Sequence, residues 1–202
     1  MDNSVLESIK RWPNVPAVYG WLSLNARGQW RLHPDGQAHA GGEGQAITNP
    51  QILTFINRNY ASDDQGQWFF QNGPQRVYVR LDAAPWILFA DDAQAQLSTH
   101  TGLVATQISQ AWMDGEGRVF LQTEHGPGMV VDRDLQRFLT GAVTDQGQAL
   151  EYWWADSDLH QCLVTGFNPT WQGFTAPLPM QRLAPDTPLD THLRFVANPQ
   201  PS

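Results

Sequence analysis

The polar residues of one predicted strand form the clearest candidate binding surface in the sequence. Arg76, Tyr78 and Arg80 alternate with apolar residues over positions 76–81. Successive side chains of a strand point to opposite faces of its sheet, so these three share a face. Arginine and tyrosine are enriched at binding hot spots, and guanidinium groups recognise carboxylates and phosphates. The pattern predicts a platform for a small anion or an acidic peptide. The alternative is that the arginines pair with acidic residues on neighbouring strands.

The densest mixed group of potential metal ligands consists of His33, Asp35, His39 and Glu43. These residues lie in a glycine-rich segment, and the segment lacks the Gly-Lys-Ser/Thr ending of a phosphate-binding loop. Metal ligands need rigid supports and a second shell of hydrogen bonds. We therefore predict a solvated, mobile loop over residues 33–45. The sequence indicates no metal, no cofactor and no catalytic residue.

His160 and Cys162 are two residues apart in a predicted strand and therefore share a face. An imidazole beside a thiol could lower the thiol pKa and create a nucleophile. The favoured alternative is a buried cysteine that acts as a small apolar residue beside a hydrogen-bonded histidine.

Pairs of acidic residues recur along the chain, and each could in principle supply acid–base chemistry in a cleft. Aspartate is also favoured in turns, because its side chain accepts hydrogen bonds from nearby backbone amides. We interpret every pair as turn chemistry. The pairs are Asp63–Asp64, Asp91–Asp92, Asp114–Glu116 and Asp156–Asp158.

Composition excludes several partners. The 202-residue chain has a formal net charge of −8, and Lys10 is its single lysine. No basic run exists to overcome this field, so we predict neither nucleic-acid nor membrane binding. The lone Cys162 rules out an intrachain disulfide. No apolar run approaches the roughly 20 residues that span a bilayer, and residues 1–13 lack the apolar segment of a signal peptide, so we expect a cytoplasmic protein.

A duplicated pattern bounds the architecture. Three apolar residues follow a helix cap at the same spacings of three, six and seven residues in both halves of the chain. Asn49 precedes Ile52, Phe55 and Ile56, and Asp132 precedes Leu135, Phe138 and Leu139. An Asp-Gln-Gly-Gln turn follows at 64–67 and at 145–148. We match the next aromatic run, 68–70, to 152–154, and Ala84-Pro85-Trp86 to Asn168-Pro169-Thr170-Trp171.

The sequence therefore predicts an α+β protein, mainly antiparallel, built from two tandem modules. Each module is a meander of strands with one helix, and the boundary lies between residues 97 and 98. A short amphipathic N-terminal helix, capped by Ser4, precedes the first module and packs on it through Val5, Leu6, Ile9 and Trp12. The proline-rich segment 176–202 is expected to be extended, with an edge strand over 192–196.

Several runs resemble an uncharacterised proteobacterial family of unknown function. They are Gly20-Trp21-Leu22-Ser23-Leu24, Ile56-Asn57-Arg58-Asn59-Tyr60, the stretch from Gly66 to Val79, and Ala84-Pro85-Trp86. The helix, the aspartate–glycine turn and the Ala-Pro-aromatic strand also resemble a second uncharacterised bacterial family of β-rich modules. The resemblance implies a bacterial cytosolic protein and carries over no catalytic residue.

We therefore expect a non-enzymatic binding or assembly module whose partner is a small anion, an acidic peptide or a protein. Two alternatives remain open. One is an enzyme with a pocket at the junction of the modules, and the other is a structural subunit that dimerises through a strand edge. The expected state is a monomer or a weak homodimer.

Overall fold

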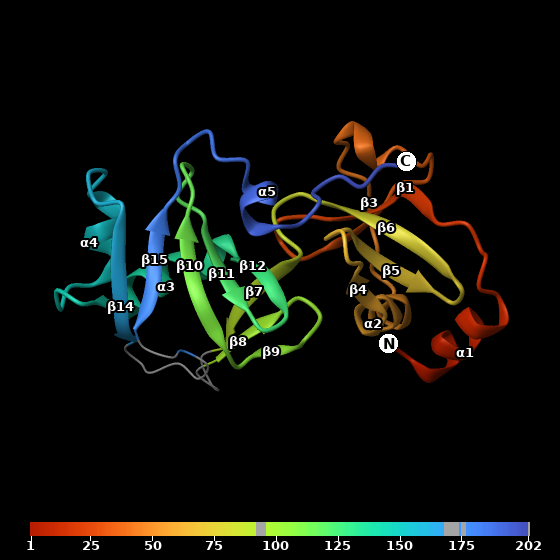
Figure 1. Ribbon diagram of the computed structural model, residues 1–202, viewed down its shortest axis with the longest axis horizontal. Coiled ribbons are helices and arrows are strands. Elements are labelled where there is room, and N and C mark those ends of the chain that lie inside the picture. The colour runs from red at the N-terminus through yellow and green to blue at the C-terminus, as the bar shows by residue number, and fades with distance from the viewer. Residues whose placement is uncertain (92–95, 168–173, 175–176, 202) are drawn as a thin grey trace. The chain divides into compact units, whose positions relative to one another are not determined.

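The computed structural model describes residues 1–91, 96–167, 174 and 177–201 (Figure 1). The chain divides into two compact units, Met1–Pro85 with Leu193–Ser202, and Trp86–His192. The boundary therefore precedes Trp86, and not residue 98 as the sequence suggested. The reason is that the strands Trp86–Asp91 and Gln96–Thr99 hydrogen-bond into the second sheet, and the last ten residues return to the first unit.

The first unit contains one six-stranded sheet, in the order β3-β2-β1-β6-β5-β4. β1 and β6 are parallel, and the other neighbouring strands are antiparallel. Its elements are α1 (Asn3–Arg11), β1 (Val18–Leu24), β2 (Trp30–Leu32), the 3-10 helix η1 (Ala38–Ala40), β3 (Gln45–Ala46), α2 (Pro50–Arg58), β4 (Tyr60–Ser62), β5 (Trp68–Asn72) and β6 (Gln75–Leu81).

The second unit contains a nine-stranded sheet, in the order β13-β14-β15-β10-β11-β12-β7-β8-β9. Its elements are β7 (Trp86–Asp91), β8 (Gln96–Thr99), β9 (Val104–Ala105), β10 (Ile108–Met113), β11 (Val119–Thr123), β12 (Gly126–Val130), α3 (Asp132–Gly141), β13 (Ala142–Thr144), α4 (Leu150–Ala155), β14 (Gln161–Phe167) and β15 (Leu178–Arg182). The helix α5 (Leu189–Leu193) follows at the boundary of the units.

The two sheets share one topology. Reading β10 to β15 as six strands in chain order gives the same spatial order as β1 to β6, with a helix between the third and fourth strands. The first and last strands of each set are parallel neighbours at the centre. The prediction of an α+β fold with two modules is confirmed. The sheets are mixed, because parallel pairing also joins β7 to β12.

Three hairpin turns are closed by the same side-chain device. The side-chain Oδ1 atoms of Asn25, Asp63 and Asp114 each accept hydrogen bonds from the backbone N–H groups two and four residues later, at 2.9–3.0 Å. The residue three positions later is a glycine with φ between 75° and 79°, a region that favours glycine. The interpretation of Asp63 and Asp114 as turn residues agrees with these bonds.

The sequence match between the halves fails after the Asp-Gln-Gly-Gln turn, which lies at 64–67 in the first half and at 145–148 in the second. The run Tyr152–Trp154 lies in α4 and not in a strand, so the second unit has a helix with no counterpart in the first. By topology β5 corresponds to β14, which begins at Gln161. The expected echo at Pro169-Thr170-Trp171 lies outside the described residues.

The two matched helices bury their apolar stripes to different extents. Asn49 Oδ1 accepts hydrogen bonds from Gln51 N at 2.9 Å and Ile52 N at 3.2 Å, which satisfies the start of α2. The Phe55 ring meets the Phe70 ring edge-on at 5.5 Å. In α3, Phe138 is completely buried. Both helices therefore pack on their sheets, as the stripes predicted.

The chain ends differ from expectation. Asp2, and not Ser4, is the N-cap residue of α1, and its side chain makes no capping hydrogen bond. Val5 is the buried residue of α1, whereas Leu6 and Trp12 are exposed. Asp2 N donates to Asn59 Oδ1 at 2.8 Å, which fixes α1 at the end of α2. Instead of a strand over 192–196 the chain forms α5, and Leu81 N then donates to Ala197 O at 2.7 Å. Among the described residues, no helix is long and apolar enough to cross a bilayer.

We expect Asn49→Ala to lower the free energy of unfolding by about 1 kcal/mol, because two amide groups at the start of α2 lose their acceptor. Urea denaturation measures this loss. Asp132→Ala is the matched control, since no side chain caps α3. It should cost about 0.5 kcal/mol or less, the size of an exposed charge–dipole interaction. Equal losses in the two variants would contradict the assigned role of Asn49.

Candidate functional site

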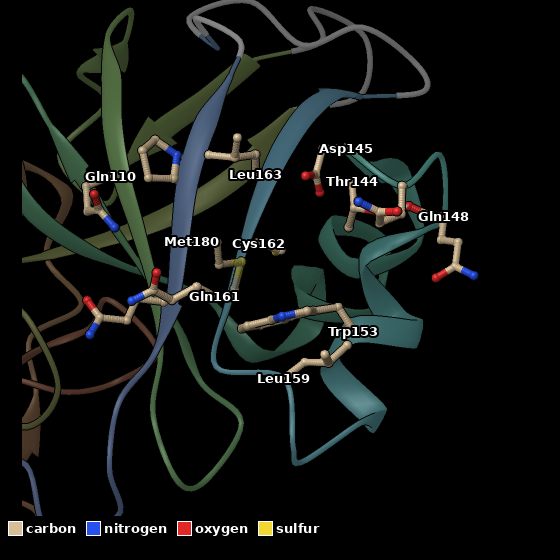
Figure 2. A pocket seen from close by; sticks show the side chains of 13 residues that line it. Gln110, Thr144, Asp145, Gln148, Trp153, Leu159, Gln161, Cys162, Leu163 and Met180 are labelled. Carbon is tan, nitrogen blue, oxygen red and sulfur yellow. The ribbon is translucent and has the colours of Figure 1, made fainter.

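A pocket of about 640 Å³ lies in the second unit, between the segment from β13 to α4 and the strands β14, β15 and β10 (Figure 2). The residues that line it are mostly amide-bearing and apolar, with Asp145 as the acidic residue among them. Figure 2 shows the Trp153 ring lying across the pocket below Cys162 and Met180. The side chain of Trp153 is buried, and no hydrogen-bond partner for its Nε1 exists among the described residues.

Arg182 holds this pocket's helix in place. Its guanidinium lies 4.9 Å from the centre of the Trp153 ring. The same group donates hydrogen bonds to the carbonyl oxygens of Trp153, Trp154 and Asp156 at 3.0–3.1 Å. Cations near a helix C-terminus satisfy its last carbonyls and favour the helix dipole. Arg182 therefore has a structural role at the end of α4.

Cys162 is not an activated nucleophile. Burial, together with the nearby Asp145 carboxylate, raises the pKa of the Cys162 thiol to about 12, although Arg182 opposes the shift. The thiolate is the reactive form, so the thiol is inert near neutral pH. His160 is exposed and is not among the groups that shift this pKa. The favoured sequence interpretation was a buried cysteine beside a hydrogen-bonded histidine, whereas Cys162 is only partly buried and His160 is exposed.

Most of the glycine-rich segment 33–45 is exposed, as the sequence suggested, but the segment is anchored on the sheet through the buried His33 and Ala38. His33 is buried, and its Nε2 lies 2.8 Å from Ser23 Oγ, a contact that sequence reasoning missed. Burial, and next the positive charge of Arg80, lowers the pKa of His33. Ser23 is fully buried and beyond the reach of a substrate, so this pair holds the segment on the sheet. Among the described residues, no group of His, Cys, Asp and Glu could hold a metal ion.

Arg80 also serves this segment. Its guanidinium donates to the carbonyl oxygen of Ala38, and at 3.0 Å to that of Gly42. It also pairs with the Asp82 carboxylate at 2.8 Å. The side chain is buried. Arg80 thus lies on the predicted face of β6, but its donors bond to the protein itself.

Arg76 and Tyr78 come together at a separate hollow. Tyr78 stacks on Tyr19 at 4.7 Å, and its hydroxyl donates to Asp63 Oδ2 at 2.9 Å. Burial, and then the Asp63 carboxylate, raises the pKa of Tyr78, although Arg76 opposes the shift. The Arg76 guanidinium lies 4.5 Å from the centre of the Phe69 ring. Asp63 and Asp64 also line the hollow. Two carboxylates against one guanidinium give this site a net negative charge, which disfavours an anion.

An apolar groove of about 680 Å³ lies on the opposite face of the first sheet, beside α2. Val18, Leu22, Val77 and Phe70 contribute from the strands, and Ile56 from the helix.

Three large side chains at this groove remain open to solvent. Trp21, Leu32 and Ile52 have exposed fractions of 44%, 40% and 50%. A break in the register of β1 between Val18 and Leu22, with Gly20 at φ 81°, brings both Trp21 and Leu22 into the lining. The Gly20-Trp21-Leu22 run was visible in the sequence, but its bulge was not.

Comparisons with known proteins give a family and no activity. A family model described as "Protein of unknown function (DUF2946)" matches residues 1–200. No curated protein matches the chain. A DUF1285 family protein from Silicibacter pomeroyi DSS-3 is 13% identical, with 86% of this chain and 85% of that chain covered and a TM-score of 0.47. A DUF1285 family protein from Shewanella baltica OS155 is 17% identical, with 59% of this chain and 90% of that chain covered and a TM-score of 0.41.

Alkylation of the single cysteine tests the pocket chemistry. At pH 8 we expect iodoacetamide to modify Cys162 in the folded protein about two to three orders of magnitude more slowly than in urea, because the raised pKa leaves little thiolate. The folded rate should keep rising with pH well above 9. Mass spectrometry follows the reaction. Similar rates in the folded and unfolded chains would contradict the assigned thiol state.

Proposed function

The chain belongs to this family of unknown function, and from the geometry of its first unit we propose that it is a non-enzymatic binding module. In this proposal the apolar groove beside α2 holds an apolar ligand or an apolar part of a partner protein. The observation that carries the proposal is the half-exposed Ile52, which borders the groove together with the exposed Trp21 and Leu32.

The size and lining of the groove support this role. Ligand sites are typically apolar concavities of roughly 300–1,000 Å³ with a few polar groups at the rim. The groove has about 680 Å³, and Asn49, Asn72 and Gln75 supply amide groups among its apolar residues. Burial of an aliphatic side chain such as Ile52 is worth about 1.5–3 kcal/mol, so leaving it open costs stability that a ligand would restore.

The second unit supports the proposal by contrast. There the connection between β14 and β15 is long, and Phe174 from it packs on Phe167 at 3.9 Å and on Phe138 at 6.2 Å. In the first unit the corresponding connection from β5 to β6 is a tight turn at Asn72–Gln75. It provides no aromatic ring, so the space beside α2 is left open. A ligand in the first unit would take the place that the Phe174 ring takes in the second.

The candidate chemical groups of the described residues favour binding over catalysis. The Ser23–His33 pair is buried, and the Cys162 thiol is protonated. Catalysis needs a nucleophile or base that a substrate can reach. The apolar groove contains no ionisable side chain. Its chemistry is that of shape and apolar contact.

We propose also that the two units are copies of one ancestral module. The shared strand order, the matched helix position and the repeated Asx turns support a duplication. One copy then keeps its groove open, and the other has filled it.

The neutral fluorescent probe N-phenyl-1-naphthylamine tests the groove. We expect saturable binding of one probe per chain with an increase in fluorescence. Ile52→Glu should weaken this binding about tenfold, because it replaces an apolar rim contact with a charge. The matched control is Leu103→Glu, since Leu103 is similarly exposed, at 45%, and lies in the second unit. Equal effects of the two substitutions, or no effect of Ile52→Glu, would refute the proposed site.

A further inference from the structure

The strand β3 at the border of the groove has an open edge. Ile47 N donates to Trp30 O at 3.0 Å, on the side of β2. Backbone groups alternate in direction along an antiparallel strand, so the N–H and C=O groups of Ala46 and Thr48 face away from β2. Both residues are exposed, and within the described ranges β3 pairs with β2 and with no other strand. Exposed edges of this kind invite the addition of another strand.

The second unit shows how such an edge is covered. β12 corresponds to β3, and β7 lies parallel to it, with Ile87 opposite Met129. Val131 N donates to Leu88 O at 2.9 Å, and Asp134 Oδ2 accepts from Ala90 N at 2.9 Å. The residues Trp86, Ile87 and Leu88 of this added strand are all buried.

The strand registers allow these contacts to be transferred to the first unit. Leu32 pairs with Gln45 as Leu121 pairs with Gly128. Counting from these pairs, Ala46 corresponds to Met129, and Thr48 to Val131. The same count places Gln51 at the position of Asp134. Thr48 N is therefore placed to donate to an incoming carbonyl, and the exposed Gln51 amide oxygen to accept from an incoming N–H.

We propose that the first unit binds an extended apolar segment of a partner protein as a strand parallel to β3. This inference rests on the proposed function of the groove, and it names the occupant. The backbone of the segment pairs with Ala46 and Thr48, and its side chains cover the exposed Ile52. In strand addition, main-chain hydrogen bonds give affinity and the neighbouring apolar pockets select the side chains. The fitting sequence resembles that of β7, Trp-Ile-Leu-Phe.

Charge complementarity adds a further requirement. The chain has a net charge of −8, so basic residues flanking the apolar segment would accelerate association and a net acidic segment would be repelled. The probe is therefore a synthetic peptide with the sequence of Pro85–Ala90 and two lysines at each end. Calorimetric titration of the full chain measures its affinity and stoichiometry.

Thr48→Pro is the decisive variant, because it removes one edge N–H. Thr48 also borders the groove, but the substitution leaves the apolar side chains of the lining unchanged. We expect it to weaken peptide binding about tenfold while the naphthylamine probe binds as in the parent chain. Retained probe binding also shows that the first unit is folded. Ile52→Glu should weaken the binding of both the probe and the peptide, and Leu103→Glu should weaken the binding of neither.

Each outcome decides one proposal. If Thr48→Pro leaves peptide affinity unchanged, strand addition is wrong although the groove binds. If the parent chain binds the naphthylamine probe but not the peptide, the occupant is not an apolar strand. If it binds neither, the proposed groove function itself fails. Sedimentation provides a further test. If the parent chain forms a dimer that persists in the presence of the peptide but dissociates in Thr48→Pro, a second copy occupies the edge and the partner proposal is overturned.

Discussion

The parallel pairing of the first and last strands at the centre of each six-strand set, β1 with β6 and β10 with β15, is the constraint on which the rest of this structure depends. With β1 beside β6, the third and fourth strands are pushed to opposite edges of the sheet. The helix that joins them must then cross one face. Five strand spacings of about 4.8 Å span roughly 24 Å, whereas a nine-residue helix is about 13–14 Å long. One helix therefore does not cover a six-stranded face, and an apolar strip beside it needs another cover.

The two units solve this problem differently. The second unit adds the Phe174 ring from the connection between β14 and β15, and it pairs the outer edge of β12 with β7. In the first unit the connection between β5 and β6 is a tight turn, and the outer edge of β3 is open. Its groove and its free edge adjoin because both border the start of α2. That adjacency follows from the topology and makes one ligand able to use both.

Several charged or titratable side chains that could bind or react with a ligand instead stabilise the fold. Arg80 and His33 fasten the glycine-rich segment to the face opposite α2, and Arg182 closes the end of α4. Buried polar groups of this kind are stable because each is hydrogen-bonded to the protein itself. The candidate residues Arg80 and His33 that the sequence offers therefore have structural roles. An apolar groove carries no comparable signal in the sequence.

Features that depend on neighbours within a few residues could be predicted from the sequence. The cap at Asn49, the apolar stripes of α2 and α3, and the Asx turns at Asp63 and Asp114 follow from helix periodicity and from local side-chain hydrogen bonds. The alternation of β6 was likewise readable, and with it the shared face of Arg76 and Tyr78.

Tertiary structure decided the rest. The run Tyr152–Trp154 fits a strand or a helix equally well, and only its packing in the second unit selects α4. The same holds for the boundary before Trp86, for the burial of Arg80, and for the exposure of Ile52 within a stripe whose other members pack inward. Each depends on which distant strands become neighbours. That choice is made by apolar burial summed over a whole unit, to which a short stretch of sequence contributes only a small part.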